Sequence, residues 1–228
     1  MLAEIQQHKN TMTISSSRQD YLLLYSVEFK FKNIIADQRT PRMLEKLKES
    51  VSECRVMDMG DYHYFIHPIT DGVPFMDPKL LQEIVDEIIR IGNFDCDYII
   101  TPEAMGIHLV VPISLTLDIP YNVIRKRRYG LPGEIDIAQC TGYSKTKMFI
   151  NGLKKGDRVV IIDDVLSTGG TMRAIINALR HTIGCEIVDV VVVFEKTEKK
   201  AELEKELEIE IKTLLKVKIV NNKVVYFD

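Results

Sequence analysis

The sequence predicts an α/β fold in which helices flank a mainly parallel, twisted sheet. Two apolar runs, RVVIID (158–163) and DVVVVF (189–194), are continuous, as in strands that are covered on both faces. DYIIT (97–101) and PYNVI (120–124) are two further short β-rich runs. Stretches with helical periodicity separate these runs, and strands that alternate with helices favour a parallel sheet.

Helical signals fill the spaces between and before the strands. Asp77 is a suitable N-cap, Pro78 suits a first helical turn, and Gly92 ends the apolar pattern that follows them. Further helices are expected for residues 104–117 and 171–181. The apolar stripe of the first helix consists of Leu81, Ile84, Val85 and Ile88, and that of the last of Met172, Ile175, Ile176 and Leu179.

Other segments break the alternation. Residues 126–148 contain LPGE and TGYSK and are expected to form a long loop or an exposed ribbon, which in a compact domain is often a lid. The charged residues 197–208 favour a solvated surface helix, and IVNNKVV (219–225) favours a hairpin with an Asn-Asn turn. Residues 1–42 lack a sustained pattern and are interpreted as an N-terminal appendage to a functional domain that spans residues 43–228.

Composition narrows the class of protein. The chain has 228 residues, 46% of them hydrophobic and 28% charged, with a net charge of -3, which is typical of a soluble globular protein and unlike a basic nucleic-acid binder. No apolar run is long enough to cross a bilayer and no signal peptide is evident, so we expect a cytoplasmic protein. His63 and His67 lie in a β-like stretch that does not favour a metal site. The four cysteines are expected to be free thiols: Cys54, Cys96, Cys140 and Cys185.

The stretch VVIIDDVLSTGGTM (159–172) combines a strand, a loop of small residues and the start of a helix. Unpaired backbone N–H groups at such a helix start can bind phosphate, and glycines allow the ligand to approach closely. A tight turn with an incidental glycine pair is the alternative. The chain has neither GxxxxGK[ST] nor GxGxxG, so the ligand is of another kind than in those phosphate loops. The candidate phosphate ligands are Ser167, Thr168, Gly169, Gly170 and Thr171.

Two acids stand directly before this loop. Asp163 and Asp164 would repel a phosphate at short range, so they are expected to meet another part of the ligand. A vicinal diol would accept such contacts, as would a hydrated Mg²⁺ that bridges to the ligand. A phosphoribosyl compound offers a phosphate and a metal-binding diol one sugar apart.

These residues carry a resemblance to a known family. VVIIDDVLSTGGT resembles the phosphoribosyl pyrophosphate signature of the type I phosphoribosyltransferases. TPEAMGI (101–107), IRKRRYGLPGE (124–134) and PITDGVPFMDPKLL (68–81) resemble the pyrophosphate loop, the lid segment and the hood of the adenine-type branch, in the family's order. YHYFIHPITDGVP and TGYSK most closely resemble the archaeal hypoxanthine/guanine enzymes of that branch. The resemblance implies a type I phosphoribosyltransferase fold with a small hood and a flexible lid.

The resemblance also implies roles for residues that bind phosphoribosyl pyrophosphate. Ser167 to Thr171 would hold the 5'-phosphate, and Asp163 and Asp164 would hold the ribose hydroxyls and orient the Mg²⁺-bound substrate. Arg125 and Lys126 would neutralise the leaving pyrophosphate; the alternative for this RKRR run is a solvated or nucleic-acid-binding patch, which suits an acidic chain poorly. The pyrophosphate loop, in the family often with a non-proline cis peptide, would comprise Glu103, Ala104, Met105 and Gly106.

The hood would choose the base. In adenine enzymes of the family a hood residue pairs with the base through its backbone N–H and C=O, and GVPFMD puts Pro74 at this position or next to it. Proline has no N–H, whereas its carbonyl can accept the N1–H of hypoxanthine or guanine. Val73 would border the base, and Phe75 would either stack on it or serve as a core aromatic.

Two departures leave the general base open. Ser167 stands where many 6-oxopurine enzymes have an acid, and Gly142 stands where adenine enzymes have a lid glutamate before Tyr143. Glu134 is a weak candidate, and proton loss to solvent or pyrophosphate is another route. The resemblance thus implies a homodimeric purine salvage enzyme that makes IMP and GMP without nucleic-acid or membrane partners. The alternatives are an adenine phosphoribosyltransferase and a phosphoribosyl-pyrophosphate-binding transcriptional regulator.

Overall fold

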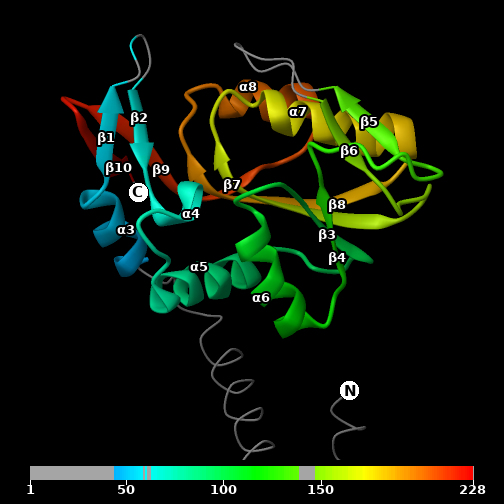
Figure 1. Ribbon diagram of the computed structural model, residues 1–228, viewed down its shortest axis with the longest axis horizontal. Helices are drawn as coiled ribbons and strands as arrows, with labels where there is room; N and C mark the ends of the chain where they lie inside the picture. Colours follow the sequence, from blue (N-terminus) through cyan, green and yellow to red (C-terminus); the bar gives the residue numbers. More distant parts are fainter. Residues whose placement is uncertain (1–43, 59, 61–62, 139–146, 228) are drawn as a thin grey trace, which may run out of the picture. The chain divides into compact units, whose positions relative to one another are not determined.

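The computed structural model describes residues 44–58, 60, 63–138 and 147–227, which are built around a six-stranded sheet (Figure 1). The strand order is β10-β9-β8-β7-β3-β4. All neighbouring strands run parallel except the terminal hairpin pair β9 and β10, so the predicted parallel α/β sheet is confirmed. The strands are β3 (Tyr98–Pro102), β4 (Tyr121–Ile124), β7 (Arg158–Leu166), β8 (Glu186–Glu195), β9 (Lys212–Val220) and β10 (Lys223–Phe227). The appendage expected for residues 1–42 lies outside the described residues.

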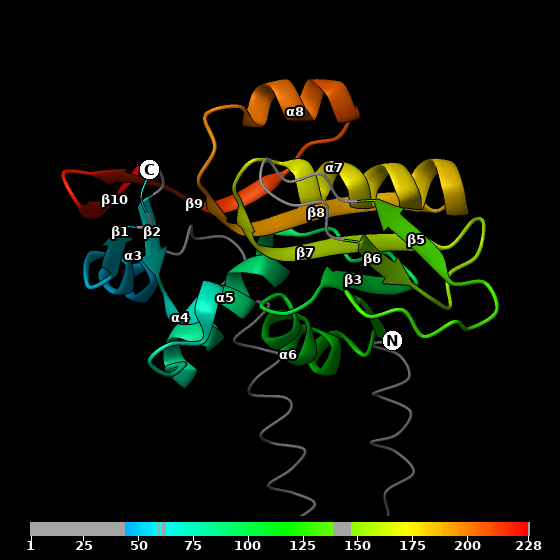
Figure 2. The ribbon, with the colours of Figure 1, turned by 45° about the horizontal axis from the view of Figure 1, so that its top comes forward.

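Helices cover both faces of the sheet. Figure 2 shows α5 and α6 below it and α7 and α8 above it. The helices are α3 (Glu45–Ser52), α4 (Pro68–Asp71), α5 (Pro78–Ile91), α6 (Ile107–Leu117), α7 (Gly170–Asn177) and α8 (Lys200–Leu207), and a π-helical segment, η1 (Ala178–Ile183), continues α7. Two antiparallel ribbons lie outside the sheet: β1 (Arg55–Asp58) with β2 (His63–Ile66), and β5 (Ile135–Ala138) with β6 (Lys147–Ile150). No helix within the described ranges is long and apolar enough to span a bilayer.

The continuous apolar run of β7 results from its burial on both sides. Val160 and Ile162 pack in the hydrophobic cluster with α5 and α6, while Val159 and Ile161 pack in the cluster with α7 and η1. All four side chains have no exposed surface. A strand whose alternate residues enter two cores must be apolar throughout, as the sequence predicted. The packing of β7 in both clusters therefore fixes the position of its carboxyl end.

Several local predictions are confirmed. The Asp77 carboxylate accepts a hydrogen bond from the Lys79 N–H at 2.9 Å, and α5 starts at Pro78 as expected. Asn221 and Asn222 both have positive φ, 50° and 60°, and close the predicted β9–β10 hairpin. Three of the four cysteines are described, and all three are free thiols: Cys54, Cys96 and Cys185.

Several boundaries differ from the predictions. The helix expected from residue 104 starts only at Ile107, because residues 103–106 form a turn after β3. The strand expected over 158–163 continues to Leu166, pairing with β8 up to Glu195. Hydrophobic periodicity did not detect this extension, since the extra residues start with the polar Asp164.

The surface helix predicted within residues 197–208 is present as α8, but one of its faces is buried. Leu203 and Leu207 are buried, each 4% exposed, and belong to the core cluster around α7. The Arg173 guanidinium on α7 binds the Glu206 carboxylate on α8 through two hydrogen bonds of 2.6 and 2.7 Å. The two leucines are four residues apart and so share one face, a narrow stripe that the surrounding charges obscured.

Candidate active site

The strand order reverses between β3 and β7. From β3 the chain passes through α6 to β4 on one side, and from β7 it passes through α7 to β8 on the other. In open α/β sheets, ligands bind in the crevice outside the carboxyl ends of the strands at such a switch point. The loops that leave β3 and β7 there are residues 103–106 and 167–169, the segments that the sequence analysis assigned to pyrophosphate and phosphate.

The loop after β7 has the predicted strand–loop–helix geometry. Gly169 is at φ 76°, a left-handed conformation that favours glycine, and Gly170 starts α7. The Gly170 N–H lies 3.5 Å from the Thr168 hydroxyl, a contact too long to occupy this amide strongly. The loop residues from Ser167 to Thr171 are thus arranged around a helix N-terminus whose amides can bind an anion.

Asp163 and Asp164 lie near the carboxyl end of β7, just before this loop. Asp163 is 7% exposed, and its Oδ1 accepts a hydrogen bond of 2.9 Å from the Asp164 N–H. Burial raises the pKa of both carboxyls, and for Asp164 the neighbouring charge of Asp163 and that of Asp71 on α4 raise it further. The pair therefore has a high electrostatic cost of ionisation, which ribose hydroxyls or a cation would lower.

The donor set fits a magnesium ion bound mainly through substrate. Two carboxylates of one strand supply hard oxygen ligands, as Mg²⁺ requires, but too few for a cage made by the protein alone. Among the described residues, no group of three or more His, Cys, Asp or Glu side chains is arranged to hold a metal. Asp163 and Asp164 would accordingly act on an ion whose remaining ligands are substrate oxygens and water.

The loop after β3 is tightly packed. The Glu103–Ala104 peptide is cis and not followed by proline, as the resemblance implied. A β-carbon on Gly106 would lie 1.8 Å from Thr101 Oγ1 and 3.3 Å from the Ile162 carbonyl oxygen of β7, so only glycine fits. The Met105 side chain reaches the hood, because its Cε lies 3.5 Å from the place of a β-carbon on Gly72. This loop thus touches both β7 and the hood.

Arg125 and Lys126 follow β4 at the same edge of the sheet. Arg125 Nε lies 2.6 Å from Glu103 Oε2, an ion pair whose N–H is not aligned for a hydrogen bond. The Lys126 N–H donates to Glu103 Oε1 at 2.7 Å. The structure therefore brings these two cationic residues to the pyrophosphate loop, through the Glu103 carboxylate.

The lid segment has a turn that Glu134 closes. Its carboxylate accepts hydrogen bonds from the Tyr129 and Gly130 N–H groups at 2.9 and 2.8 Å and from Asn151 Nδ2 at 3.1 Å. Burial alone would raise the pKa of Glu134, but these hydrogen bonds and the charge of Arg128 lower it. The contacts favour a structural role over proton transfer. The departures predicted at Gly142 and Tyr143 lie outside the described residues.

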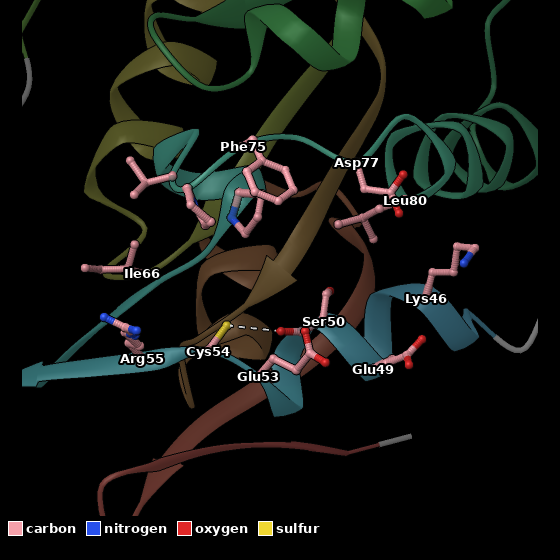
Figure 3. A pocket seen from close by; sticks show the side chains of 13 residues that line it. Lys46, Glu49, Ser50, Glu53, Cys54, Arg55, Ile66, Phe75, Asp77 and Leu80 are labelled. Carbon is pink, nitrogen blue, oxygen red and sulfur yellow. Dashed lines mark hydrogen bonds between the residues drawn. The ribbon is translucent and has the colours of Figure 1, made fainter.

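The hood residues named for the base are exposed. Phe75 is 74% exposed and Val73 51%, so Phe75 is not a core aromatic and its ring is accessible for stacking. The Val73–Pro74 peptide is cis. Behind this segment lies a cavity of about 620 Å³ (Figure 3), across which Phe75 and Asp77 lie opposite Glu49, Ser50 and Glu53. Its described lining includes none of residues 163–171, so it is on the α3 side of the hood.

His67 is a buried residue that links the start of α4 to α3. It has no exposed surface, its Nδ1 accepts a hydrogen bond from the Ile69 N–H at 3.0 Å, and Ser50 Oγ lies 2.8 Å from its Nε2. Burial lowers the pKa of His67 to about 4, so the ring is neutral at pH 7. Both ring nitrogens of His67 thus have partners within the hood and α3, which is typical of a structural histidine.

Sequence analysis missed two residues at this edge of the sheet. Asp71 on α4 is near enough to Asp164 to raise the pKa of that carboxyl. The Asp71 carboxylate itself accepts two hydrogen bonds, from Tyr64 Oη at 2.5 Å and from Thr70 Oγ1 at 2.7 Å. Thr101 occupies the space that keeps position 106 a glycine. Both residues lie within quoted motifs, TPEAMGI and PITDGVPFMDPKLL, but the motifs gave them no role, and only the packing of the folded chain reveals their contacts.

Comparisons with known proteins agree with this geometry. The family model described as phosphoribosyl transferase domain matches residues 78–226. A hypoxanthine/guanine phosphoribosyltransferase of Methanocaldococcus sp. is 56% identical over 180 residues, covering 78% of this chain and 91% of the relative. That of Methanocaldococcus jannaschii is 53% identical over 180 residues, covering 78% and 98%.

Solved structures show the same fold at much lower identity. The adenine phosphoribosyltransferase of Thermoanaerobacter pseudethanolicus is 23% identical with a TM-score of 0.60, covering 76% of this chain and 99% of that chain. That of Leishmania donovani is also 23% identical, with a TM-score of 0.62 and coverages of 77% and 80%. The fold and the sequence relatives lead to one assignment: the chain belongs to the phosphoribosyltransferase family, in the group of the archaeal hypoxanthine/guanine phosphoribosyltransferases.

Proposed function

We propose that this phosphoribosyltransferase acts in purine salvage, transferring the 5-phosphoribosyl group from phosphoribosyl pyrophosphate to hypoxanthine and guanine to give IMP, GMP and pyrophosphate. The observation that carries this proposal is the pair of the buried Asp163 and the half-buried Asp164, beside an anion-binding helix start at the sheet's switch point. The names of the sequence relatives support the choice of base.

In this reaction the purine N9 displaces pyrophosphate from C1' through an oxocarbenium-like transition state. The amides at the start of α7 would hold the 5'-phosphate, and the carboxylates of Asp163 and Asp164 would hold the ribose hydroxyls close to the developing positive charge. Mg²⁺, when bound, neutralises charge on the leaving diphosphate. Arg125 and Lys126 would stabilise the same charge, which grows as the bond breaks.

The lid segment would exclude water from the activated sugar, which water would otherwise hydrolyse. Because Glu134 is engaged by hydrogen bonds of its own turn, we assign it no proton transfer. The N9 proton would pass to solvent or to pyrophosphate. We further propose that the enzyme is a cytoplasmic, magnesium-dependent homodimer.

The panel of possible bases tests the proposal. The purified chain would be incubated with phosphoribosyl pyrophosphate and Mg²⁺ and, separately, with hypoxanthine, guanine, xanthine and adenine, and the nucleotides would be separated and quantified. We expect IMP and GMP to form fastest. Dominant AMP formation would overturn the base assignment and favour an adenine enzyme. Salt-sensitive binding to a specific DNA sequence without nucleotide formation would instead indicate a transcriptional regulator.

Base selection is predicted to depend on the missing N–H of Pro74. The variant Pro74→Ala supplies an N–H that could donate to adenine N1, whereas the carbonyl that accepts the N1–H of hypoxanthine remains. A buried unpaired polar group costs about 1 to 3 kcal/mol, so relief of that cost should raise kcat/KM for adenine relative to hypoxanthine about tenfold or more. Steady-state kinetics with both bases measure this ratio. An unchanged ratio would show that Pro74 does not select the base.

A further inference from the structure

A carboxylate in a pyrophosphate loop is unexpected, because it would repel the diphosphate that the loop binds. Glu103 supplies such a carboxylate, and both of its oxygens are engaged by the residues that follow β4. Its Oε2 pairs with the Arg125 side chain, and its Oε1 accepts the backbone N–H of Lys126. We propose that Glu103 is a positioning residue, whose carboxylate orients the Arg125 guanidinium toward the diphosphate of the substrate. This inference rests on the proposed phosphoribosyl transfer and deepens it.

The Glu103 carboxylate contacts the Arg125 guanidinium at its Nε atom. Glu103 Oε2 lies 2.6 Å from Arg125 Nε, an atom without solvent-accessible surface, although the Arg125 side chain as a whole is 41% exposed. Among the described residues, no second side-chain partner of Arg125 is found. A guanidinium has five N–H donors in a fixed plane, so a carboxylate at Nε fixes the plane and leaves the donors of the two terminal nitrogens for another anion.

The backbone of this segment is fixed by the same carboxylate. Glu103 Oε1 accepts the Lys126 N–H at 2.7 Å, and the Glu103 N–H donates to the Ile124 carbonyl at 2.9 Å. Arg125 in turn exchanges two backbone hydrogen bonds with Phe149 on β6, of 2.8 and 2.7 Å. Arg125 is thus held at its backbone and at its Nε before any ligand binds, so less side-chain entropy is lost when it binds diphosphate.

A competing role would have the opposite effect on binding. If Glu103 merely neutralised Arg125, the diphosphate would have to displace it, and removal of the carboxylate charge would strengthen diphosphate binding. If Glu103 orients Arg125, the same change weakens binding. The sign of the effect of Glu103→Gln therefore separates the two roles, because glutamine keeps the size and the acceptor for the Lys126 N–H but lacks the charge.

The experiment compares Glu103→Gln with wild type and with the control Asp95→Asn. Asp95 also pairs with an arginine, Arg158 Nη1 at 2.8 Å, but at the start of β7, far along the strand from its carboxyl end. Binding of Mg²⁺-pyrophosphate is measured by calorimetry, and KM is measured for both substrates. We expect Glu103→Gln to raise the dissociation constant of pyrophosphate and the KM of phosphoribosyl pyrophosphate about tenfold, with the KM of hypoxanthine within about twofold of wild type. Asp95→Asn should change none of them.

Three results would overturn the inference: unchanged pyrophosphate binding, tighter pyrophosphate binding, or an equal rise in the KM of hypoxanthine. A second variant tests the route through arginine, since Glu103→Gln should add no further loss in a chain that already carries Arg125→Ala. A full additional loss would show that Glu103 acts independently of Arg125. If wild type binds no pyrophosphate and forms no nucleotide, the proposed function fails as well; if wild type is active and Glu103→Gln matches it, only this inference fails.

Discussion

At the scale of single residues, the two adjacent acids at the end of β7 combine a functional arrangement with an energetic cost. Burial raises the pKa of both Asp163 and Asp164, and the charge of Asp163 raises that of Asp164 further, so these carboxyls resist ionisation in the folded protein. A carboxyl with a raised pKa stabilises the fold while it is protonated, and that stabilisation is lost as the pH rises through the folded-state pKa. The pair therefore lowers the stability of the ligand-free protein at neutral and higher pH.

The variant Asp164→Asn is predicted to stabilise the protein and to impair catalysis. It removes one charge of the pair, so at pH 8 the midpoint of thermal unfolding should rise by about 2 to 4 °C, equivalent to about 1 kcal/mol for a chain of this size. The gain should disappear near pH 4, where the wild-type carboxyls are protonated, and turnover should fall sharply at every pH. Scanning calorimetry from pH 4 to 8 measures the trend. Asp95→Asn, which removes an exposed acid, should show no such gain; a gain that persists at pH 4 would contradict the electrostatic cause.

Sequence patterns predicted most of the residues gathered at the site but not the contacts that link them. The TGGT loop and its two acids form one local motif, and a motif of adjacent residues needs no knowledge of the fold. The proximity of Asp71 to Asp164 and the packing of Thr101 against Gly106 depend on how β3, β7 and α4 are placed relative to one another. Such relations depend on tertiary structure, which one sequence does not specify locally.

At the scale of elements, α8 supports the phosphate loop. A β-carbon on Gly169 would lie 2.8 Å from Leu203 Cδ2, so Leu203 of α8 packs directly against the left-handed glycine of the loop. The Arg173–Glu206 pair fixes α8 to α7 at the same time. Sequence reading assigned residues 197–208 to solvent because charged residues dominate the segment and only two leucines form its buried face.

Truncation of Leu203 is expected to weaken binding of phosphoribosyl pyrophosphate as well as to destabilise the fold. Leu203→Ala leaves a cavity and should cost about 2 to 5 kcal/mol in the free energy of unfolding. Because the phosphate loop rests on this side chain, the KM of phosphoribosyl pyrophosphate should also rise. The control Leu207→Ala removes an equally buried leucine of the same helix and should destabilise the protein without this rise. Chemical denaturation and steady-state kinetics measure both quantities, and equal KM values in the two variants would contradict a specific role of Leu203.

At the scale of the whole molecule, alternating strands and helices were enough to predict the class of fold. The apolar runs of β7 and β8 identified buried parallel strands. The switch point between β3 and β7 could not be read from the pattern, because strand order is a property of the assembled sheet. The resemblance to the family supplied the hood, which has no pattern of its own, and it agreed with the lid that the break in alternation predicted for residues 126–148.

The domain boundary remains a prediction at this scale. A chain that starts at Met43 is expected to unfold cooperatively and to keep kcat within about twofold of the full chain, because the described part of residues 44–227 contains both hydrophobic clusters and every candidate site residue. Thermal unfolding and the hypoxanthine assay of both chains provide the measurement. An aggregated or inactive shorter chain would show that residues 1–42 are part of the functional domain.

The hood that is proposed to border the base precedes β3 in the chain, whereas the loops proposed for the sugar phosphate and the diphosphate all follow β3 or later strands. With these proposed roles, recognition of the acceptor and recognition of the donor would be encoded in separate, consecutive stretches of the gene. Exchange of one contiguous stretch would alter the choice of base while the apparatus for the activated sugar stays intact. Such modularity offers a simple evolutionary route by which one donor site could come to serve several purines.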